Sequence, residues 1–280
     1  MPCTKALGKV CFTFMPTCFS FAYFTDMTTN KPFLLISNDD GVTAKGINFL
    51  IETLRPVADI LVVAPDAPRS GAGCSITPTV PLSLKLLRDE PGLKIYSCTG
   101  TPVDCVKMAL NVLVDRRPDL IIGGINHGDN SSVNSHYSGT MGVATEGALQ
   151  GYPSVAFSLC DHSADADFEP LQPYLIDFVF KAIAIGMPQL SCLNINFPKR
   201  KKFEGVRICR MARSRWEKET LRRKHPHGGE YYWLVGSCRE LEPEATDTDR
   251  WALAHGYVAV TPTQLDVTAY KLIEVLKDVM

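Results

Sequence analysis

The sequence predicts an α/β fold with a mostly parallel sheet, helices on both faces of it, and a smaller C-terminal extension of β-hairpin and helix. Over about the first two hundred residues, short apolar runs of strand length alternate with longer segments of helical periodicity. The apolar runs are nearly continuous, which is typical of parallel strands buried on both faces. After residue 198, strand-like runs with polar connections follow.

The core elements follow one another in βα order. Phe33 opens the first apolar run, and Ile47, Leu50 and Leu54 have the spacing of one buried helix face. Pro102 stands at the start of a later helix, where its missing N–H costs nothing. Apolar runs predict strands at 33–37, 59–64, 82–87, 94–97, 119–123, 154–158 and 193–197, and periodicity predicts helices at 45–54, 102–114, 141–150 and 171–185.

The remaining segments predict a three-part organisation: an extension over residues 1–30, a core over 31–198 and an extension over 199–280. In the last part we expect strands at 206–211, 231–235 and 257–260 and a closing helix at 267–279. The apolar stretch 10–24 resembles a secretory signal, but it lacks a cleavage site and Pro16 interrupts it. A start codon assigned upstream of Met27 explains it better.

Composition narrows the function classes. The net charge of −1 creates no global field that would favour nucleic acid or an anionic membrane. A basic stretch at 199–224 and an acidic stretch at 230–249 are expected to pair with each other or with a second subunit. The ten cysteines include no CxxC pair, which argues against zinc ribbons and thioredoxin-like chemistry and favours a reducing, cytoplasmic location.

Polar clusters follow three of the predicted core strands. The carboxyl ends of parallel strands lie at one edge of a sheet, so these clusters should converge. Oxygen donors of this kind suit Mg, Mn or Ca, whereas the alternative is an Asp-rich turn followed by a helix cap. The clusters are Asn38, Asp39 and Asp40; Asp66, Arg69, Ser70 and Ser75; and Asn126, His127, Asp129 and Asn130.

Ser138, Gly139 and Thr140 open the helix predicted near 141–150. Free backbone N–H groups and small side chains at a helix start favour a phosphate. The alternative is a Ser N-cap, with small residues that allow close helix packing. A divalent cation beside such a site indicates phosphate-ester hydrolysis by a metal-activated water. Asp104 is expected to have a structural role beside the Thr101 cap, and His127, His136 and His162 are weak candidates for acid catalysts.

The motifs together resemble the SurE family of metal-dependent nucleotidases, from about residue 33 to residue 262. Several ordered motifs agree, which makes the match specific. They are the Asn-Asp-Asp-Gly turn at 38–41, the Arg-Ser-Gly-Ala-Gly-Cys-Ser loop at 69–75, the Gly-Thr-Pro-Val-Asp segment at 100–104, the Gly-Ile-Asn-His-Gly-Asp-Asn segment at 124–130, the Tyr-Ser-Gly-Thr turn at 137–140 and the Asn-Ile-Asn-Phe-Pro segment at 194–198.

The resemblance implies a Rossmann-like core whose C-terminal extension forms a homodimer or homotetramer. It also implies hydrolysis of nucleoside monophosphates at the 5′ and often the 3′ position, and in some members of short polyphosphate. One divalent ion per subunit, Mn²⁺ or Mg²⁺, would be bound by Asp39, Asp40, Ser70 and Asn126, the two Asp being the catalytic residues. Cys74 departs from the family pattern. The expected phosphate contacts are Asn38, Asn130, Ser138, Gly139 and Thr140.

Three rival interpretations remain open at this point. An aspartyl-phosphate phosphatase would use an Asp nucleophile, although such enzymes have Asp-x-Asp spacing and this chain has adjacent Asp39 and Asp40. A regulatory module could bind nucleotide and metal without turnover. Nucleic-acid binding by the basic stretch is the weakest of the three. The sequence does not choose the nucleotide, the ion, the oligomer or the carboxylate that acts as base.

Overall fold

A computed structural model of the chain describes residues 31–280, of which 32–280 form one compact unit. The predictions about the N-terminal apolar stretch and the upstream start codon lie outside the described residues. Within residues 31–280, no helix has the length and apolar character needed to cross a membrane.

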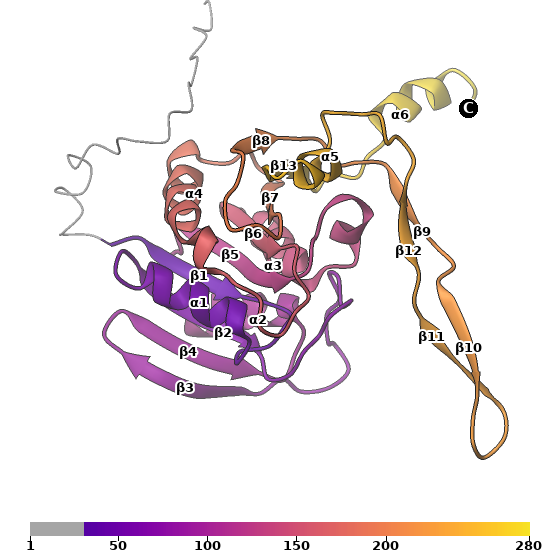
Figure 1. Cartoon of the computed structure of the whole chain (residues 1–280). Helices are drawn as coiled ribbons and strands as arrows, with labels where there is room; N and C mark the ends of the chain where they lie inside the picture. Colours follow the sequence, from indigo (N-terminus) through magenta and orange to yellow (C-terminus); the bar gives the residue numbers. More distant parts are fainter. Residues whose placement is uncertain (1–30) are drawn as a thin grey trace, which may run out of the picture. The chain divides into compact units, whose positions relative to one another are not determined.

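Nine strands of this unit form one mixed sheet in the order β3-β4-β2-β1-β5-β6-β7-β13-β8 (Figure 1). All neighbours from β4 to β7 are parallel, whereas β3 and β13 run antiparallel to β4 and β7. The predicted mostly parallel sheet is therefore confirmed. The strands are β1 (Phe33–Ser37), β2 (Asp59–Pro65), β3 (Leu84–Glu90), β4 (Leu93–Cys98), β5 (Leu120–His127), β6 (Ser154–Leu159), β7 (Ser191–Phe197), β8 (Val206–Ile208) and β13 (Val258–Gln264).

Apolar side chains cover both faces of the sheet. Leu34 and Ile36 of β1 belong to one buried cluster, and Leu35 between them belongs to another, because successive side chains of a strand point to opposite faces. Helices α1 (Lys45–Leu54) and α4 (Gln172–Ile185) pack on the first face, and α2 (Pro102–Met108) and α3 (Gly139–Leu149) pack on the second.

Several element boundaries differ from the predictions. Strand β5 continues to His127 instead of ending at Gly123, because Asn126 pairs with Ser158 of β6 after a shift in register. The predicted helix at 102–114 is α2 followed by a π-helical turn (η2, Ala109–Leu113). Two 3-10 turns, η3 (Ser132–His136) and η4 (Glu169–Leu171), precede α3 and α4.

The C-terminal part both extends the sheet and forms a hairpin arm. The arm pairs β10 (Thr220–Lys224) with β11 (Glu230–Leu234) and β9 (Ser214–Glu217) with β12 (Ser237–Glu240), as Figure 1 shows. Sequence patterns missed β9, β10 and β12, because these strands have no continuous buried face. Helices α5 (Asp249–Ala254) and α6 (Tyr270–Lys277) flank β13, and α5 was also missed.

The basic and acidic stretches pair with each other within the chain, as one of the two alternatives predicted. Arg210 contacts both Glu242 and Asp247, the latter at 2.8 Å, and Arg239 lies 3.3 Å from Glu217. Most of these side chains are exposed to solvent. Each pair therefore contributes little to stability.

Candidate functional site

The three polar clusters meet at the carboxyl ends of β1, β2 and β5. Strand β1 lies between β2 and β5, so the loops after these strands adjoin one another. A cavity of about 650 Å³ opens there. It is lined by Asp39, Ser70, Gly71, Asn126, His127, Asp129, Asn130, Asn134, Tyr137, Ser138 and His162, and from the arm by Trp216, Glu219, Leu234, Val235 and Gly236.

Asp39 is almost fully buried at the tip of β1, with 3% of its surface exposed. Its Oδ1 accepts a hydrogen bond of 2.6 Å from the Thr140 hydroxyl, and its Oδ2 accepts one of 3.1 Å from the backbone N–H of Gly139. Burial raises the pKa of Asp39, and the neighbouring charge of Asp40 raises it too, while the Thr140 hydrogen bond opposes this shift. The carboxylate is thus held by donors, and within residues 31–280 no ion pair neutralises it.

Asp40 is anchored to the end of β5. Its Oδ2 accepts a hydrogen bond of 3.1 Å from the backbone N–H of His127. Burial raises the pKa of Asp40 as well, and the His127 N–H works in the opposite direction. Burial thus disfavours the charged form of both adjacent carboxyl groups, and a bound cation would counter this effect, since an opposite charge favours the charged form.

The donor set fits a hard divalent cation. Carboxylates of Asp39 and Asp40, the Ser70 hydroxyl and the Asn126 amide offer only oxygen atoms, the ligands that Mg²⁺, Mn²⁺ and Ca²⁺ prefer. The amide of Asn126 donates from Nδ2 to the Gly128 carbonyl at 2.7 Å, which leaves Oδ1 as the acceptor. Within residues 31–280, no group of three or more His, Cys, Asp or Glu side chains could hold a metal. A zinc-type centre of such ligands is therefore absent from the described residues.

The start of α3 contacts Asp39, which the sequence did not predict. The Gly139 N–H and the Thr140 hydroxyl, expected to face phosphate, both donate to the Asp39 carboxylate. A Cβ on Gly139 would lie 2.7 Å from Cβ of Asp39, so only glycine fits this approach. Ser138 caps the helix by accepting from the Met141 N–H at 3.0 Å, and it lines the cavity.

The two asparagines predicted to contact phosphate occupy different positions. Asn38 is fully buried and donates to the Gly41 carbonyl at 3.0 Å, while its Oδ1 has no partner within residues 31–280. Asn130 lines the cavity and donates from Nδ2 to Ser158 Oγ at 2.8 Å. Its backbone N–H donates to Asn196 Oδ1, also at 2.8 Å. Asn130 is thus fixed from beneath by the neighbouring strands, whereas Asn38 supports the turn itself.

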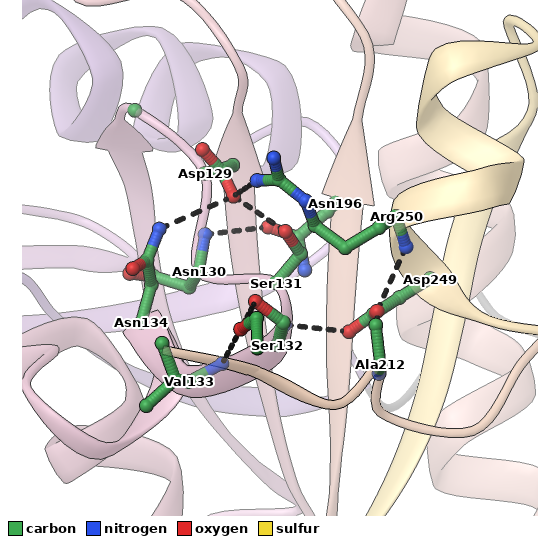
Figure 2. Close-up of polar contacts among 12 residues, drawn as sticks. Asp129, Asn130, Ser131, Ser132, Val133, Asn134, Asn196, Ala212, Asp249 and Arg250 are labelled. Atoms are coloured by element: carbon green, nitrogen blue, oxygen red, sulfur yellow. Dashed lines mark hydrogen bonds and ion pairs between the residues drawn. The ribbon is translucent and has the colours of Figure 1, made fainter. Parts of the chain in front are cut away.

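A buried carboxylate from α5 holds the loop that carries Asn130, as Figure 2 shows. Asp249 accepts hydrogen bonds from the backbone N–H groups of Ser132, at 2.7 Å, and Ala212, at 2.9 Å. The guanidinium of the adjacent Arg250 lies 3.5 Å from the Asp129 carboxylate. Sequence reasoning missed this pair, because no local pattern connects α5 with a loop more than a hundred residues upstream.

Some of the other predicted candidates have structural contacts, and others line the cavity. Asp104 completes a capping box with Thr101 at the start of α2, which confirms its structural role. Arg69 contacts Asp66 and the Thr99 carbonyl and does not line the cavity. His127 and His162 line the cavity, and His136 does not.

Comparisons with known proteins match most of the chain. Residues 34–218 match the family model described as "Survival protein SurE". A protein of Phocaeicola vulgatus named "5'-nucleotidase SurE" is 56% identical over 90% of this chain and 98% of its own length. One of the same name from Bacteroides thetaiotaomicron is 51% identical over 89% of this chain and 96% of its own length. The solved structure of the Sure protein from Aquifex aeolicus has a TM-score of 0.76 and 35% identity, covering 89% of this chain and 99% of that one.

Proposed function

The chain belongs to the SurE family, and on that premise we propose that it is a 5′-nucleotidase, which hydrolyses nucleoside 5′-monophosphates to nucleoside and inorganic phosphate. The observation that carries this proposal is the pair of adjacent carboxylates at the end of a central strand, Asp39 buried and Asp40 partly buried. Both have raised pKa values, and Asp39 lines an open cavity together with Ser70 and Asn126.

We infer that one divalent ion per chain, Mn²⁺ or Mg²⁺, is held by Asp39, Asp40, Ser70 and Asn126. When bound, such an ion polarises the phosphoryl oxygen and lowers the pKa of the attacking water. The oxygen-only donor set and the two adjacent carboxyl groups with raised pKa values support this inference. The ion would also explain why two neighbouring Asp side chains, one buried and one partly buried, lie at the same strand end.

The chain's own groups orient the reaction. Thr140 and Gly139 fix the Asp39 carboxylate, and the His127 N–H fixes that of Asp40. Asn130 and Ser138 both line the cavity and are the groups that we assign to the phosphate oxygens. The attacking water must lose a proton, and we assign the role of base to one of the two carboxylates, Asp39 or Asp40.

The geometry weighs against an aspartyl-phosphate mechanism. An Asp nucleophile needs an oxygen that can approach phosphorus in line. Each oxygen of Asp39 already accepts one hydrogen bond inside the fold, and in our proposal the metal ion takes the lone pair that would otherwise attack phosphorus. Water is therefore the nucleophile in our proposal. A phospho-enzyme trapped during turnover would contradict it.

Release of phosphate from a panel of nucleoside monophosphates tests the function. We expect the full-length protein to release phosphate with Mn²⁺ or Mg²⁺ and to stop in EDTA. An Asp40→Asn variant should be inactive, whereas Asp115→Asn, an exposed Asp away from the cavity, should retain activity. Nucleotide binding without phosphate release under any metal condition would refute the enzyme and favour a regulatory binding module.

The C-terminal extension is our proposed oligomer contact, giving a homodimer or a homotetramer. Large apolar side chains on the arm and on α6 are exposed, among them Trp233 at 60% and Leu234 at 87%. Sedimentation analysis of the protein and of a Trp233→Ser/Leu234→Ser variant would test this contact. We also propose a cytoplasmic location, because every cysteine within residues 31–280 is a free thiol.

A further inference from the structure

We propose that Trp216 of the hairpin arm stacks on the base of the nucleotide and thereby sets the preference for nucleotides over simpler phosphate esters. This inference rests on the proposed function, because it assigns the part of the same cavity that receives the nucleoside.

The cavity has two chemically different ends. Loops of the main sheet supply carboxylates, amides and hydroxyls, including Asp39, Ser70 and Asn130. The arm supplies an indole and apolar residues, Trp216 from β9 and Leu234 and Val235 from the β11 side. A nucleoside monophosphate has the same division, with a charged phosphate at one end and a flat heteroaromatic base at the other.

The indole of Trp216 is held in a defined position. Its Nε1 donates a hydrogen bond of 3.0 Å to Oδ1 of Asn134 in the cavity loop. Gly236 packs against the ring, since a Cβ there would lie 3.3 Å from Cε3 of Trp216, and the φ of +129° also favours glycine. Asn134 thus contacts the N–H edge of the indole and Gly236 packs near Cε3, while the side chain still lines the cavity.

The loop that positions Trp216 is itself anchored. The Asn134 amide donates to the Asp129 carboxylate at 3.4 Å, and Arg250 contacts the same carboxylate (Figure 2). An amide held at its nitrogen presents its oxygen to the indole N–H. Asn134 therefore acts as a positioning residue for the stacking surface, and a pre-positioned ring loses little rotamer freedom when a base binds.

A base suits this end better than a second phosphate. Glu219, also from the arm, lines the cavity, and its carboxylate would repel an anion. It can accept a hydrogen bond from an amino group of a base. Stacking of a base on an aromatic side chain typically changes affinity about fivefold to 150-fold.

The test compares AMP with ribose 5-phosphate, which keeps the sugar and phosphate and lacks the base. We would measure kcat/KM for both substrates with Mn²⁺ in the full-length protein. The ratio of AMP to ribose 5-phosphate should fall about tenfold or more in Trp216→Leu, mainly through KM for AMP. Trp216→Phe keeps an aromatic ring and should retain most of the ratio. This second variant keeps the proposal testable if the Leu variant folds poorly.

Tyr96→Leu is the matched control, because Tyr96 is a partly exposed aromatic residue of β4 that does not line the cavity and lies outside the proposed oligomer contact. Its ratio should equal that of the wild-type protein. An equal loss on both substrates in Trp216→Leu and Trp216→Phe would overturn the assignment of Trp216 and leave the nucleotidase proposal intact. Failure of the wild-type protein to hydrolyse either substrate would refute the proposed function and, with it, this inference.

Discussion

Removing the hydroxyl of Thr140 tests whether this residue supports the metal site or contacts the phosphate. Thr140 is fully buried and donates at 2.6 Å to the Asp39 carboxylate, which is itself 3% exposed. Thr140→Val removes this donor with almost no change in shape. If the hydroxyl mainly orients Asp39, the variant should bind Mn²⁺ more weakly, while KM for nucleotide at saturating Mn²⁺ should change little.

The structure sets the size of this effect. A hydrogen bond to a charged group contributes about 1.5–3 kcal/mol, which corresponds to roughly tenfold to 150-fold in Mn²⁺ affinity. That range overlaps the effect typical of residues that orient metal ligands, about tenfold to 100-fold. Loss of the donor also raises the pKa of Asp39 further, because the Thr140 hydrogen bond opposes the effect of burial. The acidic limb of the pH–rate profile should therefore move to higher pH.

The assay is phosphate release titrated against buffered free Mn²⁺. Thr140→Ser keeps the hydroxyl and should restore most of the affinity. Thr53→Val, which changes another buried threonine on α1, should leave the Mn²⁺ titration unaltered. Unchanged Mn²⁺ affinity in Thr140→Val together with a raised KM for nucleotide would refute our reasoning. It would show that this helix start binds phosphate.

The remaining predictions concern the same site and its anchor. Asp39→Asn should abolish phosphate release while circular dichroism stays unchanged, and near-normal turnover at saturating Mn²⁺ would contradict the metal assignment. Asn126→Ala should weaken Mn²⁺ binding about tenfold or more, so an unchanged titration would count against Asn126 as a ligand. Asp249→Asn should lower the free energy of unfolding by about 1–3 kcal/mol in urea, because backbone N–H groups lose a buried acceptor, whereas Asp247→Asn on the exposed side should have a smaller effect. In EDTA, burial keeps the pKa of Asp40 above 3.8, so the folded state binds the extra proton. Wild-type stability relative to Asp40→Asn should therefore fall as pH rises above about 4, and a rise would contradict the pKa shift.

Local patterns were sufficient to predict the sheet and the loops that carry the site. Continuous apolar runs indicate strands buried on both faces, and a parallel sheet brings the ends of its strands to one edge. The convergence of Asp39, Ser70 and Asn126 at one cavity follows from these two facts. The strands of the arm were harder to predict, because exposed strands such as β10 have no buried face that would impose an alternating pattern.

Local sequence patterns did not predict which acceptor each hydrogen-bond donor contacts. Ser138, Gly139 and Thr140 were correctly placed at a helix start, but the position of α3 against β1 gives two of their donors to Asp39. A burial pattern reports which residues lie inside and not which atoms meet there. Such pairing depends on distances that arise only when the helix packs on the sheet.

By itself, therefore, the sequence determined the class of fold, the family and the oxygen-rich loops at the sheet edge, because these depend on periodicity and on motifs with a fixed spacing. Only the tertiary structure decided that Asp249 holds the cavity loop and that Trp216 lines the cavity with Asp39. These residues come from distant parts of the chain. Their roles depend on how α5 and the arm pack against the loop after β5, which no local pattern encodes.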